Sequence, residues 1–202
     1  MRQGTGKFSW PDGSSYVGEF MNDMMHGKGE FTWPTRACYK GEWRNNKKDG
    51  QGRMEYKDGS VYVGTWHDDK RQGEGIMTWK NGAQYNGTFE DDMKDGHGIY
   101  RWPNGCEYDG AWVKGKRHGQ GNCTYPDGGK YIGMFKNNTK DGEGTFTFKD
   151  GSEYVGQWKN DLKEGRGTFI WSDGHKFTGG WSAGESQTGI LITPDGISKP
   201  IN

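Results

Sequence analysis

Hydrophobic and polar residues alternate along this chain in short runs, and the pattern repeats every 23 residues. In one copy, residues 50–56 alternate, Lys-Asp-Gly follows at 57–59, and residues 61–66 alternate again. A period of two predicts β-strands, and an Asp-Gly turn between two such runs predicts a hairpin. Pairing Met54 with Tyr62 places all the aromatic positions of the copy on the same face. Eight copies therefore predict an all-β chain of about eight β-hairpins.

Two short motifs mark each copy. The first is Tyr-x-Gly-x-aromatic, as in Tyr154-Val155-Gly156-Gln157-Trp158, and the second is Gly-x-Gly, as in Gly165-Arg166-Gly167. Glycine inside a strand is unfavourable unless another group must come close, so we expect these glycines to leave room for rings of neighbouring hairpins. A phosphate-binding loop would need a third glycine and a following helix, and the sequence indicates neither.

The turns and connectors show where the copies differ. Seven copies carry Asp-Gly, or Asn-Gly, at the turn, whereas the second reads Pro34-Thr35-Arg36-Ala37, for which we expect a different turn. Between hairpins we expect polar six-residue connectors, such as residues 67–72. The Gly-x-Gly pair is lost after Trp181. We therefore expect one repeat array over residues 1–202, regular over about 4–181, with an irregular C-terminal cap at 182–202.

Composition narrows the class of protein. The chain has 202 residues and a formal net charge of zero, and its apolar surface comes mainly from 10 Trp, 10 Tyr and 9 Phe. Large rings can support a thin structure, and a neutral chain is a poor candidate for nucleic acid binding. We find no apolar run of about 18 residues and no apolar signal segment. Three cysteines at different repeat phases are not a disulfide framework, so we expect an intracellular, cytoplasmic protein.

Residues suited to catalysis or metal binding are scattered. The five histidines fall on expected connectors and turns, and neither His-Glu-x-x-His nor Cys-x-x-Cys spacing occurs. No nucleophile, base and orienting group come together in the sequence. We therefore expect no enzymatic activity, no cofactor and no metal.

The repeated phrase resembles the MORN repeat (membrane occupation and recognition nexus). One matching copy is Tyr62-Val63-Gly64-Thr65-Trp66, followed by Gly73-Glu74-Gly75, and the resemblance covers about residues 4–181. Departures are Ala37 at a turn, Phe177 in place of tyrosine, and the tail. The resemblance implies an elongated, single-layer, twisted antiparallel meander of hairpins with rings on its concave side. Members of this family recur in cytoskeletal and ciliary assemblies, in junctional membrane proteins and as modules attached to enzymes.

Aromatic residues at fixed phases are the strongest candidate binding surface. An exposed groove of this kind suits a protein partner bound as an extended peptide or a single helix. The candidate groove residues are Trp10, Trp33, Tyr56, Trp79, Trp102, Tyr125, Tyr62, Tyr85, Tyr108 and Tyr131. The sequence leaves open whether these rings contact a partner or form only the core. The favoured function is a non-catalytic scaffold in a cytoskeletal or ciliary (axonemal) assembly, and a homodimer is compatible with it.

A row of basic residues supports a second hypothesis. At one phase of the repeat stand Lys48, Arg71, Lys94, Arg117, Lys140 and Lys163. Such a row could bind anionic phospholipids, including phosphoinositides, and make the protein a peripheral membrane tether. Acidic residues precede and follow the row, so a solvated edge of mixed charge is the simpler interpretation. The chain could also be the repeat region of a larger protein.

Overall fold

The computed structural model describes residues 1–201, which form eighteen β-strands and contain no helix. The described residues accordingly include no helix that could cross a membrane. Two compact units, Met1–Pro103 and the residues from Asn104 onward, make up the chain. Within each unit, consecutive strands pair antiparallel. The prediction of an all-β antiparallel meander of hairpins is confirmed.

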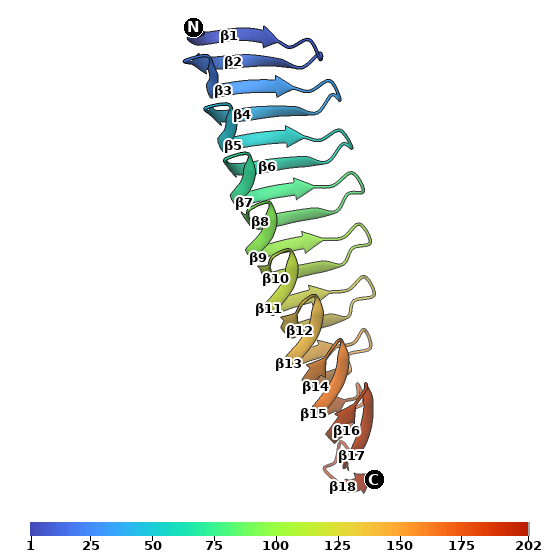
Figure 1. Cartoon of the computed structure of the whole chain (residues 1–202). Coiled ribbons are helices and arrows are strands. Elements are labelled where there is room, and N and C mark those ends of the chain that lie inside the picture. Colours follow the sequence, from blue (N-terminus) through green and yellow to red (C-terminus); the bar gives the residue numbers. More distant parts are fainter. Residues whose placement is uncertain (202) are drawn as a thin grey trace. The chain divides into compact units, whose positions relative to one another are not determined.

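The first unit is a meander of nine strands that lie side by side in chain order (Figure 1). They are β1 (Gly4–Ser9), β2 (Ser15–Met21), β3 (Met24–Thr32), β4 (Cys38–Arg44), β5 (Lys47–Glu55), β6 (Val61–His67), β7 (Lys70–Thr78), β8 (Gln84–Glu90) and β9 (Met93–Arg101).

The second unit repeats the same arrangement. Its strands are β10 (Glu107–Val113), β11 (Lys116–Thr124), β12 (Lys130–Lys136), β13 (Thr139–Thr147), β14 (Glu153–Lys159), β15 (Leu162–Ile170), β16 (Lys176–Ser182), β17 (Glu185–Ile192) and β18 (Ser198–Ile201).

The register of the hairpins follows the alternation of the sequence. Across β5 and β6, Met54 stands opposite Tyr62, Gly52 opposite Gly64 and Gly50 opposite Trp66, as predicted. All the rings of the copy therefore share one side of the sheet, which we call the ring face. The other side, which carries residues such as Val63 and Thr65, is the polar face.

The core of each repeat is a tyrosine ring that covers a pair of glycines. Tyr62 lies over Gly64 on its own strand and Gly75 on β7, where a Cβ atom at either glycine would overlap the ring. Its hydroxyl donates a hydrogen bond of 3.0 Å to the carbonyl oxygen of Thr65. Trp66 packs edge-to-face on Tyr62, with ring centroids 5.1 Å apart. The expectation that a neighbouring hairpin's ring fills the glycine slot is thus confirmed for Gly75.

The same arrangement recurs through both units. The tyrosines that occupy it are fully buried, with 0% of their surface exposed: Tyr16, Tyr39, Tyr62, Tyr85, Tyr108, Tyr131 and Tyr154. Edge-to-face pairs of rings stabilise the fold beyond the effect of the apolar area they bury. These tyrosines and their partner rings therefore take the place of the aliphatic core that the chain lacks.

The first glycine of each Gly-x-Gly pair has a different task. Gly73 has φ +68°, and a Cβ there would lie 3.7 Å from Thr65 rather than against a ring. It lies in a β-bulge of β7, where the register shifts between Gly64 and Trp66 of the partner strand. A left-handed residue in a bulge is best supplied by glycine. The expectation that both glycines of the pair accommodate rings is therefore wrong for the first one.

The hairpins are joined by two-residue turns, and the expected six-residue connectors do not exist. Asn22 and Asp23, between β2 and β3, have φ values of 51° and 65°. Two consecutive positive φ values define the type I′ turn that suits the twist of paired strands. The remaining polar residues of each expected connector belong to strand ends and to the bulge. These turns lack glycine at most copies, and Asn and Asp tolerate the left-handed region well enough to replace it.

The second copy keeps the ordinary turn despite its sequence. The Arg36 amide donates to the carbonyl oxygen of Trp33, as the Gly13 amide does to Trp10 in the first copy. Arg36 takes φ +68° in the place of the glycine. The expectation of a different turn at residues 34–37 is therefore wrong, because the surrounding strand pairing holds Arg36 in a conformation that it would not choose alone.

The chain beyond Trp181 continues the meander as β17 and β18. Gly179 pairs with Gly189, and Phe177 packs over this pair as tyrosine does in the earlier copies. The bulge in β17 is one residue shorter than in the regular repeats, so its glycine arrives one position early. That deletion explains why the sequence pattern ends there. Asn202, the last residue of the expected cap, lies outside the described residues.

We predict that Gly75→Ala destabilises the protein by about 3 kcal/mol, because the new methyl group must displace the buried ring of Tyr62. Urea unfolding followed by tryptophan fluorescence measures the change. Gly6→Ala is the matched control: Gly6 has the same repeat phase, and a Cβ there would meet only Phe20 at 3.7 Å. Equal losses of stability in the two variants would contradict the tyrosine-on-glycine core.

The buried tyrosines also predict alkaline unfolding. Burial raises the pKa of Tyr62 from its ordinary 10.0 to about 12, and Tyr16, Tyr108 and Tyr154 shift in the same way. The folded state holds the phenolic proton more tightly, so this stabilisation is present below pH 10 and lost as the pH rises from 10 to 12. We expect phenolate absorbance and loss of β-sheet circular dichroism to rise together above pH 10. In denaturant, the same phenols should ionise near pH 10, which is the control. Phenolates that form near pH 10 while the protein is still folded would contradict the prediction.

Candidate partner-binding surface

Each hairpin closes in a three-residue turn, such as residues 57–59 between the paired residues Tyr56 and Ser60. A row of half-exposed aromatic side chains lies on the ring face beside these three-residue turns. In the first unit it contains Trp10, Trp33, Tyr56, Trp79 and Trp102, and in the second Tyr125, Phe148 and Trp171. The Tyr56 carbonyl oxygen accepts the amide hydrogen bond of Gly59 that closes the turn, so the backbone of the hairpin positions each ring. We call this set the aromatic row. Six of its eight members were predicted to line the groove: Trp10, Trp33, Tyr56, Trp79, Trp102 and Tyr125. Their contact with a partner stays a prediction.

A second set of rings fills the spaces between members of the aromatic row. Phe31 lies between Trp10 and Trp33, with centroid distances of 5.3 and 4.6 Å. Phe146 lies likewise between Tyr125 and Phe148, at 5.6 and 4.6 Å. These interleaved rings were not among the predicted site residues. In the sequence, an aromatic residue stands two positions before most members of the aromatic row. Met or Cys takes that position in three copies, which obscures the pattern.

The predicted tyrosine line of the groove is buried. Tyr62, Tyr85, Tyr108 and Tyr131 have no exposed surface because each ring lies on its glycine pair. A partner on the ring face cannot reach these side chains in this structure. Their expected place on the contact surface is corrected accordingly.

The predicted basic row rests on aromatic rings. In the first unit, Lys48 Nζ lies 4.0 Å from the ring centroid of Trp66, and Lys94 Nζ lies 4.4 Å from that of Tyr100. In the second, Lys140 and Lys163 each place Nζ 4.1 Å from a tryptophan ring, and the Arg117 guanidinium lies 5.2 Å from Phe135. Arg71 lies over Phe89 at 5.3 Å. Cations at these distances gain cation–π stabilisation, so the row is part of the packed ring face.

Arg2 is a further member of this row that the sequence analysis missed. Its guanidinium carbon lies 4.3 Å from the ring of Phe8, and it stands at the same repeat phase as Lys48. Met25 occupies the same repeat phase between Arg2 and Lys48, so the row of basic residues is interrupted and Arg2 was not recognised as part of it.

Acidic residues of the two-residue turns bind the backbone of the basic row. The Lys48 amide donates to Asp69 Oδ1 at 2.9 Å, and the Asp69 amide donates to the Lys48 carbonyl oxygen at 3.0 Å. Asp161 makes the same pair of bonds with Lys140. Burial lowers the pKa of the Lys48 and Lys140 ammonium groups. Hydrogen bonds between the turn acids and the backbone of the basic residues thus link each hairpin to the next.

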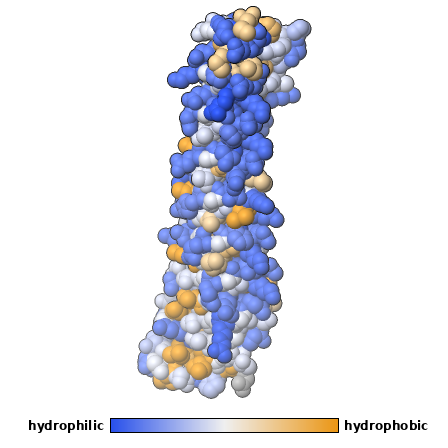
Figure 2. Space-filling view, turned by 60° about the vertical axis from the view of Figure 1, so that its left-hand side comes forward, coloured by the Kyte–Doolittle hydropathy of each residue, from blue (hydrophilic) through white to orange (hydrophobic). Residues whose placement is uncertain are grey.

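Two hollows lie on the polar face. One of about 650 Å³ in the first unit is bordered by Val17, Lys28, Glu30 and Lys40, and one of about 710 Å³ in the second includes Thr168. The surface seen in Figure 2 is mostly hydrophilic, with apolar residues scattered along it. The resemblance implies a concave side lined with rings, but these two hollows lie on the opposite, polar face.

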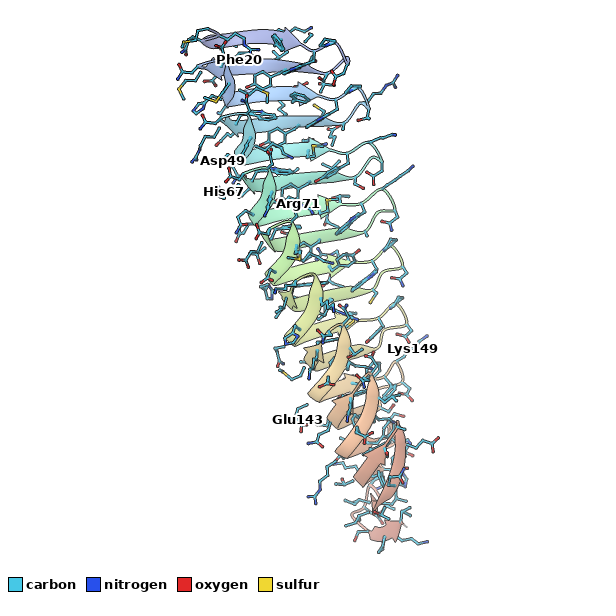
Figure 3. The ribbon with its side chains drawn as sticks, in the orientation of Figure 1. Phe20, Asp49, His67, Arg71, Glu143 and Lys149 are labelled. Atoms are coloured by element: carbon cyan, nitrogen blue, oxygen red, sulfur yellow. The ribbon has the colours of Figure 1, made fainter. Side chains whose placement is uncertain are left out.

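Asp49 joins two neighbouring turns of the first unit. Its side chain is only 8% exposed, and its oxygens lie 2.7 Å from Arg44 Nη2 and 3.1 Å from His67 Nδ1. Figure 3 shows Asp49 and His67 close together near the two-residue turns. No nucleophilic side chain is among these partners. Within residues 1–201, no group of three or more His, Cys, Asp and Glu residues is arranged to hold a metal ion.

The fold brings Cys106 and Cys123 together. Their sulfur atoms are 3.9 Å apart and both thiols are free. Burial raises the pKa of Cys106 to about 11, which keeps the thiol protonated and unreactive at neutral pH. The pair therefore acts as packing in the second unit.

Comparison with known proteins identifies the repeat. The family model described as "MORN repeat" matches residues 1–15, 16–37, 39–61, 62–84, 85–107, 108–130, 131–153 and 154–176. A comparison with curated proteins returned no match.

Several solved structures resemble the chain distantly. One is the TCP domain of SAS-4 (dCPAP) from Drosophila melanogaster in complex with a proline-rich motif of Ana2, at 14% identity and a TM-score of 0.37, covering 98% of this chain and 90% of that one. Another is the TCP10 domain of Danio rerio CPAP, at 14% identity and a TM-score of 0.37, covering 98% of each chain. At these scores neither likeness carries an argument about this protein.

Proposed function

The chain belongs to the MORN-repeat family, and from that premise we propose that it is a non-catalytic scaffold that holds protein partners on its aromatic row. The family indicates a repeat protein, and no enzymatic family is matched. The binding surface lies on the rings of the aromatic row because the tyrosine and the second aromatic residue of the shared motif are buried in the core.

The half-exposed aromatic row is the observation that carries this proposal. Trp33, Trp79 and Trp102 keep part of each ring in contact with solvent, although large aromatic side chains gain most from full burial. Tryptophan and tyrosine dominate the energetics of protein interfaces when a partner covers them. Their rings are also held rigidly by neighbouring rings, so a partner would lose little side-chain entropy in binding them.

The spacing of the row favours an extended partner. Within a unit, successive members are one repeat, or two strands, apart, which is about 10 Å. A polyproline II segment rises about 3.1 Å per residue and returns to the same face every third residue, about 9.3 Å along its axis. Side chains at every third position of such a segment could therefore meet successive rings. A helix would match the row once in about seven residues.

We place this scaffold in a cytoskeletal or ciliary (axonemal) assembly, an assignment that rests on the family resemblance. Repeat arrays of this kind present many similar sites along one surface, which suits a protein that organises an assembly. Its location and its partners are part of the proposal.

We predict that Trp79→Ala combined with Trp102→Ala weakens binding of partner peptides at least tenfold, because two half-exposed rings leave the surface. Affinity selection from a cell extract, with quantitative mass spectrometry, identifies the ligands, and titration of the recovered segments measures the loss. Val63→Ala combined with Ile76→Ala changes two exposed residues of the polar face and is the control. Retained binding in a folded Trp79→Ala/Trp102→Ala variant argues against the row.

The membrane-tether hypothesis has a separate test. Because Lys48, Lys140 and Lys163 rest on rings and are half-buried, we expect little sedimentation with vesicles that contain phosphoinositides, even at low salt. Binding at low salt that falls with added salt, and that is lost in Lys140→Gln/Lys163→Gln, would instead support the tether. Vesicles of neutral lipid alone are the control.

A further inference from the structure

The ladder of rings in the first unit has a break beside Tyr56. Phe31 fills the space between Trp10 and Trp33, and Tyr100 packs against Trp79 at 5.3 Å. At the corresponding phase, the residues flanking Tyr56 are Met54 and Met77. Among residues 1–201, no other ring stacks on Tyr56, so its side chain stands alone in the row.

A hollow of about 410 Å³ opens at this break, between Tyr56 and Trp79. Met77, which is only 6% exposed, forms its floor, and Arg71, Lys57 and Asp58 border it. The volume is at the lower end of the range of small-molecule pockets, about 300–1,000 Å³, and suffices for one large side chain. We call this hollow the Tyr56–Trp79 socket.

Arg71 is fixed at the side of the socket with donors to spare. Its Nε donates to Asp92 Oδ1 at 3.0 Å and its Nη2 to the Asp92 carbonyl oxygen at 2.8 Å. The acceptor for Nη1 is the sulfur of Met77, at 3.9 Å, and a thioether is a weak acceptor. The charged side chain is only 19% exposed and points along the ring face, where Figure 3 labels it. A carboxylate in the socket would be a much stronger acceptor for Nη1.

Arg71 is already ion-paired with Asp92, so the socket offers an anion the unused donors of the guanidinium rather than an excess of positive charge. Asp58 is the acidic group of the lining, and its two oxygens accept hydrogen bonds from the Ser60 amide and hydroxyl at 2.9 and 3.0 Å. Lys57 is exposed on the same rim and makes no ion pair in the described structure. The apolar part of the socket has two ring walls and a methionine floor, which suit an aromatic guest through ring–ring and sulfur–ring contacts.

We propose that the Tyr56–Trp79 socket anchors one aromatic side chain of a partner peptide, next to a residue of that peptide whose carboxylate binds Arg71. The inference rests on the proposed function and names the residues that the partner supplies. The aromatic row continues on both sides of the socket, through Trp33 and Trp102, and contacts the rest of the segment. The socket selects the partner because Met77 stands where five other copies carry a ring.

The test begins with a random peptide library displayed on phage and selected on the whole chain. We expect enriched peptides to carry an aromatic residue beside Asp or Glu. Met77→Phe then places in the socket the ring that Phe31 supplies two repeats earlier, and we expect binding to fall at least tenfold. Ile76→Phe adds the same ring to the polar face of the same strand and should leave binding unchanged. Thermal unfolding confirms that both variants fold.

Arg71→Gln separates the carboxylate contact from the ring contact. It should weaken binding of the selected acidic peptides about tenfold, and have little effect on peptides in which the acid is replaced by its amide. Peptides that bind Met77→Phe as tightly as the unaltered chain, while losing affinity for Trp102→Ala, overturn the socket and leave the proposed function standing. A selection that enriches no peptide overturns both, and enrichment of peptides without an aromatic residue overturns the socket.

Discussion

The contact between a tyrosine ring and a pair of facing glycines is the constraint on which this structure depends. Tyr62 can lie flat on the sheet only because Gly64 and Gly75 have no side chains there, and its hydroxyl then reaches the Thr65 carbonyl oxygen. A single sheet has no second layer to bury its apolar face, so the rings must bury themselves against their own backbone. Repetition of this contact in seven copies, with Phe177 in the eighth, lets a chain poor in aliphatic residues fold without a two-layer core.

The same constraint explains why other rings stay half-exposed. Once the tyrosines occupy the glycine slots, the rings beside the three-residue turns have only neighbouring rings to pack on. The lysines and arginines of the basic row cover another part of the face, with their charges above the rings and their backbones held by Asp69 and its equivalents. Core, basic row and aromatic row are therefore one packed system, and the aromatic row is the part of its rings that stays accessible.

Several features of the fold were readable from the sequence, and the failures have common causes. The register of Met54 and Tyr62 followed from alternation, since a slip of one residue would put every ring on the wrong face. The two-residue turns were hidden because Asn22 and Asp23 carry no glycine signal, and the turn at Arg36 was misread because its glycine is missing while its hydrogen bonds are kept. A one-residue deletion in a bulge concealed Gly189.

The sequence by itself determined the repeat, the strand faces and the chemical types available at each phase, because period-two alternation and glycine spacing act locally. Only the tertiary structure decided which rings are reachable. Tyr62 and Tyr56 have the same side chain in the same repeat, yet one lies buried on glycines and the other stands at the edge of a socket. Tyr62 is buried because Gly64 and, on the adjacent strand, Gly75 leave room for its ring. The socket beside Tyr56 is bordered by Met77 and by an arginine that the next turn holds in place. Contacts between strands, rather than any local pattern, divide the aromatic residues into core and candidate binding surface.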